Sequence, residues 1–546
     1  MPPVKHHGLP PATDSGRTGR NGIFPCHLPP APLNCKSRPG LNPAGGTREM
    51  NGEHIMTTEV ERPRKTKIIC TIGPKTASFE AIRQLAEQGM NVARLNMSHG
   101  SQEWHRGVIS NIKRYNKKFA GSLAIMLDTR GAEIRSGDLK QDLFLKIGDI
   151  LTLTTRRQAE LEPYCVEVSH DGFVSEVALG DIILVDGGML RLRVVEITRT
   201  DVRCESLDEG VLGSRRHLNV RGKSAALPAI TEQDWLDIDF GIAQRIDFIA
   251  LSFVRTAQPI IELQHHLQEQ GVAVEILAKI ESAASIPELD AIIAVADGIM
   301  IARGDLGAEL SYEEVPLLQD EIVKKCRRAG KPVVVATHML ESMIVNPTPT
   351  RAEVTDITHA VQQGTDAIML SGETATGRYP FKALEVMDVV AKRIERHQEL
   401  NSPVGADAGE PYCAGSKGNE GPQAAARIRS KVEISRSAAI LGNNLGAAGT
   451  LVITRRGLMA ALLSNCRPAS PIFAFTNTTH VRRRLGIYWG VHAFVVKLSS
   501  DPEVSIQRAV EQLLRKNIVH RGEQIIVLSD ILAGGKFVET VQVRII

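Results

Sequence analysis

Charged side chains follow two short apolar runs near the middle of this 546-residue sequence. Lys279 and Glu281 come shortly after the run 274–277, and Asp305 follows the run 298–300. Apolar runs of this length are typical of buried parallel strands. Charges at the ends of such strands are costly unless something satisfies them, so they indicate either a binding site or a structural ion pair. A lysine can stabilise developing negative charge, and two carboxylates are hard oxygen donors for a cation such as Mg²⁺.

Alternating strand and helix patterns position these residues. The apolar run 67–72 ends at Gly73-Pro74, and residues 78–88 have the apolar spacing of a helix. The alternation continues to residue 131 and resumes after residue 230. The eight strands that it predicts are 67–72, 92–95, 123–127, 248–252, 274–279, 298–301, 332–336 and 367–370. Eight βα units predict a TIM (β/α)8 barrel, an α/β fold whose active site lies at the carboxyl ends of the strands.

Polar residues gather at those strand ends. A single one is readily explained as a satisfied core group, but a random scatter would not favour one end of nearly every strand. The set comprises Arg94, Asn96, Ser98, Asp128, Thr129, Ser252, Lys279, Glu281, Arg303, Asp305, Thr337, Ser371 and Glu373. We therefore expect these side chains to share one site.

Two regions depart from the barrel pattern. Residues 132–229 lose the helical period, and Gly- and Asp-rich turns separate their β-rich runs at 150–155, 164–168, 182–185, 190–197 and 202–206. This texture predicts an inserted small β-barrel that acts as a lid over the active-site face. Residues 401–422 are rich in Gly and Pro, as in a linker or loop insertion. A helix at 424–445 and strands at 451–454, 472–475, 525–528 and 538–543 then predict a C-terminal α/β domain.

The domain boundaries that we expect are therefore a tail at 1–63, a barrel at 64–131 and 230–400, a lid at 132–229, and a C-terminal domain at 401–546. The tail has no strand or helix period, and before residue 48 its only acid is Asp14. It resembles an organellar transit peptide; a disordered extension or a gene-model artefact is the alternative.

Composition excludes several classes of protein. Apolar residues make up 43% and charged residues 23%, which is ordinary for a globular protein, and the net charge of +3 indicates no nucleic-acid partner. No uninterrupted apolar run is long enough to span a membrane. The eight cysteines are scattered without a C-x-x-C pair, so the sequence favours neither a zinc site nor a disulfide framework and suits a reducing compartment.

Several long segments resemble pyruvate kinase. They include TKIICTIGP at 66–74, GMNVARLNMSHG at 89–100, LDTRGAEIR at 127–135, ILAKIES at 276–282, MIARGDLG at 300–307, ATHMLESM at 336–343, PTPTRAEVTD at 347–356 and IMLSGETA at 368–375. The segments 215–224 and 485–490 are most similar to the plastid-type branch of plants and algae. The resemblance implies transfer of the phosphoryl group of phosphoenolpyruvate to ADP, giving pyruvate and ATP in the last step of glycolysis.

The resemblance also implies a role for each site residue. Lys279, Arg94 and Thr337 are the implied catalytic residues, and the substrate also contacts Ser252, Gly304 and Asp305. Mg²⁺ (or Mn²⁺) is implied at Glu281 and Asp305, and K⁺ at Asn96, Ser98, Asp128 and Thr129, with Glu133 accompanying potassium dependence. The implied nucleotide-phosphate contacts are His99, Arg135 and Arg216, although a solvated loop arginine is the alternative for Arg216. Ser371 and Glu373 could join a water network that protonates the enolate.

Partners and location follow from the same resemblance. We expect phosphoenolpyruvate and ADP/ATP as ligands, no nucleic acid or membrane, and a homo- or hetero-tetramer. The plastid stroma is the expected location, with the cytoplasm as the alternative. Two rival interpretations are another phosphoenolpyruvate-using TIM barrel and a catalytically weak regulatory subunit; the additional domains argue against the first and the retained Lys279, Glu281, Asp305 and Thr337 against the second.

Overall fold

The computed structural model describes residues 63–132, 134–158, 161–185, 188–220, 228–401, 422–533 and 536–546. The expected tail, Glu133 and most of the expected linker (402–421) lie outside the described residues. The linker's two end residues belong instead to helices, because α11 extends to Asn401 and α12 begins at Pro422.

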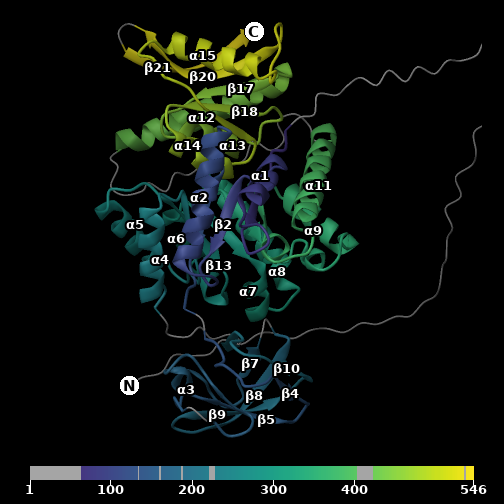
Figure 1. Ribbon diagram of the computed structural model, residues 1–546. Coiled ribbons are helices and arrows are strands. Elements are labelled where there is room, and N and C mark those ends of the chain that lie inside the picture. The colour runs from purple at the N-terminus through teal and green to yellow at the C-terminus, as the bar shows by residue number, and fades with distance from the viewer. Residues whose placement is uncertain are drawn as a thin grey trace, which may run out of the picture. The chain divides into compact units, whose positions relative to one another are not determined.

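Eight parallel strands form a closed barrel (Figure 1). Their order around the barrel is β1-β16-β15-β14-β13-β12-β3-β2, so the first and last strands pair and close it. The strands are β1 (Lys67–Thr71), β2 (Val92–Asn96), β3 (Ala124–Asp128), β12 (Phe248–Leu251), β13 (Glu275–Ile280), β14 (Gly298–Ala302), β15 (Val333–Ala336) and β16 (Ala367–Leu370). The predicted TIM barrel is therefore confirmed.

Both faces of these strands are buried. Alternate residues such as Met126, Phe248 and Met300 fill the barrel interior, and their neighbours pack outward against the helices. The barrel helices are α1 (Phe79–Glu87), α2 (Gln102–Lys118), α4 (Glu232–Ala243), α5 (Gln258–Glu269), α6 (Leu289–Val295), α7 (Arg303–Glu309), α8 (Glu314–Ala329), α9 (Arg351–Gln362), α10 (Gly372–Ala375) and α11 (Pro380–Asn401), with 3-10 turns η1 (Ala283–Ser285) and η2 (Glu341–Ile344). Polar side chains are therefore confined mainly to the ends of the strands.

The inserted region between β3 and α4 is built from short strands. One sheet of six strands has the order β11-β7-β8-β9-β5-β6, and β10 pairs with β4 in a second ladder. Its elements are β4 (Leu143–Leu145), β5 (Ile150–Thr154), β6 (Cys165–Glu167), α3 (Phe173–Glu176), β7 (Ile182–Val185), β8 (Leu190–Ile197), β9 (Asp201–Ser206), β10 (Gly210–Leu212) and β11 (Leu218–Val220). The sequence patterns missed β4, β10 and β11, which have three residues each and are too short for an alternation to be visible.

The C-terminal region is a second α/β unit around the sheet β19-β18-β17-β20-β21. Its elements are α12 (Pro422–Leu445), β17 (Gly449–Ile453), α13 (Leu458–Asn465), β18 (Ile472–Thr476), α14 (Thr479–Arg484), η3 (Leu485–Ile487), β19 (Val491–Val495), α15 (Pro502–Arg515), β20 (Gln524–Ala533) and β21 (Lys536–Ile545). Throughout the part of the chain that the structure describes, every helix is too short or too polar to cross a lipid bilayer.

Candidate active site

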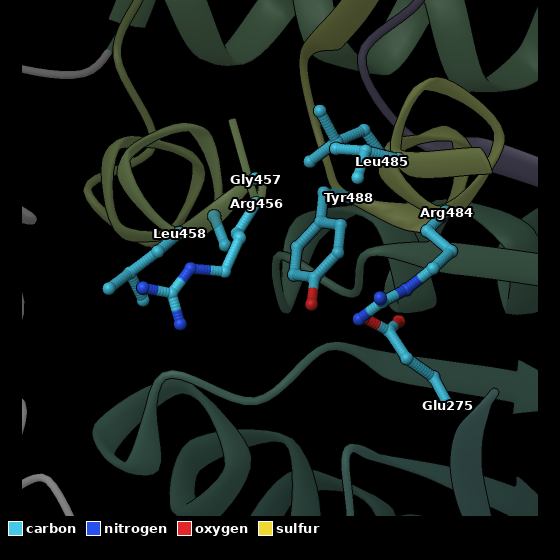
Figure 2. Close-up of a pocket in the computed structure, with 9 residues that line it drawn as sticks. Glu275, Arg456, Gly457, Leu458, Arg484, Leu485 and Tyr488 are labelled. Atoms are coloured by element: carbon cyan, nitrogen blue, oxygen red, sulfur yellow. The ribbon is translucent and has the colours of Figure 1, made fainter. Parts of the chain in front are cut away.

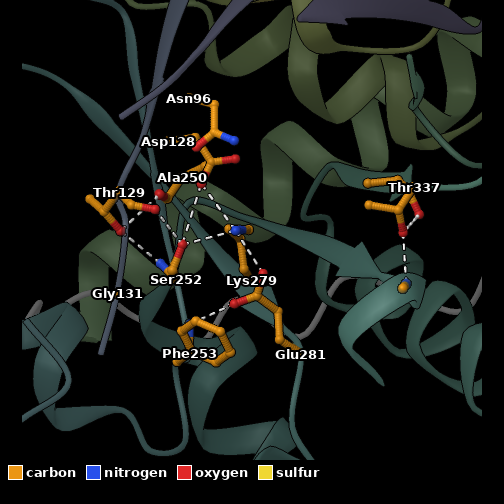
Figure 3. Close-up of polar contacts among 12 residues, drawn as sticks. Asn96, Asp128, Thr129, Gly131, Ala250, Ser252, Phe253, Lys279, Glu281 and Thr337 are labelled. Carbon is orange, nitrogen blue, oxygen red and sulfur yellow. Dashed lines mark hydrogen bonds and ion pairs between the residues drawn. The ribbon is translucent and has the colours of Figure 1, made fainter. Parts of the chain in front are cut away.

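A buried lysine lies near the carboxyl end of β13. Its Nζ atom is 3.0 Å from Asp128 Oδ1 and 2.6 Å from Glu281 Oε1, and it donates a hydrogen bond to Ser252 Oγ at 2.8 Å (Figure 3). Asp128 ends β3, Ser252 follows β12, and Glu281 follows β13. The exposed fraction of Lys279 is 8%, and those of its three partners are at most 1%. Residues far apart in the sequence thus meet around one ammonium group.

Hydroxyl and backbone groups hold this cluster in place. Ser252 Oγ donates to the carbonyl of Thr129 at 2.7 Å, and the Ser252 amide donates to Thr129 Oγ1 at 3.0 Å. The Phe253 amide donates to Glu281 Oε2 at 2.7 Å, from a residue with a left-handed φ of 51°. The sequence analysis missed this last contact because a backbone conformation of this kind leaves no trace in the residue type.

A second cation flanks the carboxylate of Asp128. Arg94 Nε lies 2.5 Å from Asp128 Oδ2, and its Nη1 donates to Thr71 Oγ1 at 2.9 Å. Arg94 is buried in the middle of β2, the strand next to β3. Asp128 therefore fixes two positive charges, Arg94 and Lys279, side by side.

Burial and neighbouring charges set the ionisation of these groups. Burial opposes charge on Asp128, but Arg94 and Lys279 outweigh it and hold the pKa of Asp128 below its ordinary value. Burial also disfavours the ammonium of Lys279, yet Asp128 and Glu281 raise its pKa above the ordinary value. Burial raises the pKa of Glu281; Lys279 opposes that rise, and the charge of Asp305 adds to it. Lys279 therefore carries its proton, and the pKa of Glu281 stays above its ordinary value because burial and the charge of Asp305 outweigh the effect of Lys279.

Glu281 and Asp305 fit a divalent cation. Their mutual repulsion is the kind of strain that a metal ion relieves, and both supply carboxylate oxygens. Asp305 lies in the first turn of α7 and is partly exposed. Among the described residues, no group of three or more His, Cys, Asp and Glu side chains is arranged to hold a metal ion. Two carboxylates leave several coordination positions for substrate oxygens and water, as Mg²⁺ usually requires.

The residues expected at potassium lie on two neighbouring strands. Asn96 and Asp128 are directly paired at the ends of β2 and β3, and Asn96 Oδ1 accepts a hydrogen bond from the Ser98 amide at 3.1 Å. Thr129 follows Asp128, and its carbonyl and hydroxyl oxygens both accept hydrogen bonds from Ser252. All four residues offer oxygen atoms, which suits an alkali cation.

The residues expected at the nucleotide phosphates fall in two places. His99 is exposed in the loop after β2. Arg135 and Arg216 belong to adjacent segments of the inserted region: the Ser136 amide donates to the Arg216 carbonyl at 2.8 Å, and Arg135 Nη1 donates to the Arg215 carbonyl at 3.0 Å. Arg135 and Arg216 therefore lie on neighbouring backbone segments of the inserted region, whereas His99 lies in a loop of the barrel.

Thr337 follows β15 in an unusual conformation. Its φ is 65°, and its Oγ1 donates to the Ala336 carbonyl at 2.7 Å and accepts from the Gly304 amide at 2.8 Å. A Cβ atom added at Gly304 would lie 3.4 Å from this hydroxyl and 3.2 Å from the His338 ring, so the glycine permits a close approach of the two loops. The amide of Gly304, a residue that we expected to contact the substrate, donates to Thr337 in this structure.

The carboxylate of Glu373, in the segment after β16, is bonded to backbone amides. Glu373 is fully buried and accepts hydrogen bonds from the amides of Leu340 (3.0 Å) and Ser371 (2.7 Å). Burial raises the pKa of its carboxyl group. Through these two hydrogen bonds Glu373 braces the loops after β15 and β16. Its expected part in a water network stays a prediction.

A cavity lies beside the loop that follows β17. Thr454 Oγ1 accepts from the Gly457 amide at 3.0 Å, which closes the loop before α13. The Arg484 guanidinium contacts the carboxylate of Glu275, the first residue of β13 (Figure 2). The cavity measures about 160 Å³, and its lining includes Glu275, Arg456, Gly457, Leu458, Arg484 and Tyr488.

The barrel and its strand-end cluster together define a class of protein: a TIM-barrel enzyme that handles an anionic group with fixed cations and oxygen ligands for metal ions. Family models for the pyruvate kinase barrel domain and the pyruvate kinase alpha/beta domain match residues 63–384 and 432–544. The chain belongs to the pyruvate kinase family, and it transfers the phosphoryl group of phosphoenolpyruvate to ADP, giving pyruvate and ATP.

Individual relatives agree with this membership. The chain is 48% identical to plastidial pyruvate kinase 2 of Arabidopsis thaliana over 85% of this chain and 78% of the relative. It is 48% identical to the chloroplastic pyruvate kinase isozyme G of Nicotiana tabacum, over 85% of this chain and 80% of that one. A crystal structure of a pyruvate kinase from Cryptosporidium parvum superposes with a TM-score of 0.77 and 34% identity, covering 88% of this chain and 96% of the other.

Proposed function

We propose that Lys279 and Arg94 stabilise the transferring phosphoryl group and that Lys279 then stabilises the enolate left behind. The observation that carries this proposal is the Lys279 ammonium, held by Asp128, Glu281 and Ser252 at the carboxyl end of the barrel. Phosphoryl transfer depends mainly on positioning and on electrostatic stabilisation of the equatorial oxygens. Two protonated cations fixed in a buried site supply that stabilisation with little reorganisation.

Other residues orient the substrate. Thr337 Oγ1, directly after β15, contacts the substrate and orders the water that delivers a proton to the enolate carbon. Ser252 and the first turn of α7, at Gly304 and Asp305, complete the substrate pocket. His99, Arg135 and Arg216 contact the nucleotide phosphates, and residues 132–229 close over the site as a lid between the barrel segments 64–131 and 230–400.

The family uses a divalent and a monovalent cation. We propose that Glu281 and Asp305 hold Mg²⁺ (or Mn²⁺) and that Asn96, Ser98, Asp128 and Thr129 hold K⁺. When bound, these ions supply positive charge to the phosphoryl and carboxylate oxygens of the substrate.

Substitution of the two acidic ligands tests these assignments. Glu281→Gln and Asp305→Asn preserve shape but remove one anionic donor each, so we expect loss of turnover in a folded protein and weaker Mn²⁺ binding by isothermal titration calorimetry. The matched control is Glu309→Gln, an acid at the other end of α7 that accepts from the Ala283 amide. Recovery of most of the rate in excess Mg²⁺, or unchanged Mn²⁺ affinity, would contradict the assignment.

The assembly and location are further proposals. We propose a tetramer of one or two kinds of chain, as is usual in the resembled family. Light scattering of the purified chain, with pyruvate formation measured on the same sample, tests whether it assembles and works alone.

The plastidial names of the relatives and the arginine-rich, acid-poor start of residues 1–63 support the plastid stroma over the cytoplasm. Imaging a fluorescent fusion of this segment tests the proposed location.

A further inference from the structure

The chain turns through two strained residues after β15. Thr337 and His338 have φ values of 65° and 56°, in the left-handed region that side chains with a Cβ atom rarely adopt. Within the described residues they are the only consecutive non-glycine pair with positive φ, and Thr337 is the only β-branched residue among them. Such a conformation persists only where the surrounding structure imposes it. Something must therefore hold this turn.

The side chain of Arg303 contacts two successive carbonyl groups, at the end of β15 and at the first residue of the turn. Its Nη2 atom donates to the Thr337 carbonyl at 2.7 Å, and its Nε donates to the Ala336 carbonyl at 3.3 Å. The next residue, Gly304, donates its amide to Thr337 Oγ1 at 2.8 Å. Two successive residues of α7 thus donate hydrogen bonds to Thr337, one to its carbonyl and one to its hydroxyl group.

An acid on a third element anchors the arginine. Arg303 Nη1 lies 2.6 Å from Asp356 Oδ1, on α9. This helix begins with a capping box in which Thr350 and Glu353 bond reciprocally, so its first turns are well defined. The Arg303 side chain is only 11% exposed. Because Nε, Nη1 and Nη2 all donate to protein groups, the guanidinium acts on the loop.

We propose that Arg303, anchored by Asp356, is a positioning residue that imposes the left-handed conformation of Thr337 and thereby places its hydroxyl for the reaction. The inference rests on the substrate role proposed above for Thr337. A lysine cannot replace the arginine here, because a single ammonium group cannot reach two carbonyls and a carboxylate in a fixed fork.

A double-mutant cycle on the purified enzyme tests this inference. Arg303→Lys should lower kcat by about 10- to 100-fold, since a displacement near 1 Å can cost about 100-fold. In a Thr337→Ala background the same substitution should change kcat by less than about threefold, because the group through which it acts is already absent. Asp356→Asn should show a smaller loss with the same dependence on Thr337, and it replaces Arg303→Lys in the cycle if that variant does not fold.

Arg467→Lys is the matched control. The guanidinium group of Arg467 likewise contacts an acid and a carbonyl: Asp366 at 3.0 Å and the Gly364 carbonyl at 2.8 Å. Asp366, however, precedes β16 and so lies at the end of the barrel opposite the site. The effect of Arg467→Lys on kcat should be the same factor with and without Thr337. Multiplicative losses for Arg303→Lys and Thr337→Ala would overturn the positioning role while leaving the substrate role of Thr337 intact. A fully active Thr337→Ala enzyme would overturn both.

Discussion

Replacing Lys279 by methionine removes the ammonium group and keeps a buried, unbranched side chain. In the structure this group lies 3.0 Å from Asp128 and 2.6 Å from Glu281. A charge about 4 Å from a transferring phosphoryl oxygen contributes about 4 kcal/mol at an effective dielectric constant of about 20. Since about 1.4 kcal/mol corresponds to tenfold in rate, we expect kcat to fall by about 10³-fold.

The same substitution leaves a buried carboxylate without its cation. Asp128 keeps Arg94 at 2.5 Å, whereas Glu281 keeps only the Phe253 amide among the contacts described above. Breaking a buried pair in this way costs up to about 3–5 kcal/mol of folding free energy, so thermal unfolding must be measured beside the rate. The assay is pyruvate formation coupled to NADH oxidation, at saturating phosphoenolpyruvate and ADP.

The control is a second buried lysine. Lys67 begins β1, at the end of the barrel opposite the site, and its Nζ donates to the Val491 carbonyl at 2.6 Å. Lys67→Met should therefore alter stability and leave kcat largely unchanged. A folded Lys279→Met enzyme with a rate within about tenfold of the parent, which is less than about 1.4 kcal/mol, would refute the assignment of Lys279 as the main electrostatic catalyst.

Three further predictions concern salt, pH and regulation. Because Asp128 and its oxygen-bearing neighbours suit an alkali cation, K⁺ should activate the enzyme and Na⁺ should serve poorly; equal rates in the two salts at matched ionic strength would count against the site. Burial, followed by the charge of Arg64, lowers the pKa of Lys67 from 10.5 to about 7. Between these two pH values the unfolded chain binds a proton that the folded chain lacks, so the free energy of unfolding rises with pH by up to about 1.4 kcal/mol per unit. Lys67→Met should remove this slope from denaturation curves measured at several pH values. An unchanged slope would contradict the assigned shift. Fructose 1,6-bisphosphate should not activate the enzyme. In activated members of the resembled family, a loop after a strand of the C-terminal domain holds the 6-phosphate, and in the corresponding segment 454–460 Met459 stands in place of a hydroxyl donor. A lost charge-assisted hydrogen bond costs about 1.5–3 kcal/mol; a leftward shift of the phosphoenolpyruvate saturation curve would show the opposite.

Local patterns predicted the barrel strands well because each is a short apolar run buried on both faces. The strand 367–370 coincides with β16, and within the inserted region the runs 182–185 and 190–197 coincide with β7 and β8. The strand β19 was missed, since His492 interrupts its short apolar run. It is a strand because it pairs with β18 along its whole length, and that pairing is a property of the tertiary structure.

By itself, the sequence determined which residues stand at the strand ends, because a βα repeat sends every strand into the barrel in the same direction. It therefore predicted that Asp128, Ser252 and Lys279 would share a site. Only the tertiary structure decided that the Lys279 ammonium lies between two carboxylates, and that Arg303 reaches across to the turn at Thr337. These contacts join different strands and helices, and their geometry depends on barrel closure and on left-handed backbone conformations. Residue type and local spacing carry no record of either, because both arise when distant segments pack against one another.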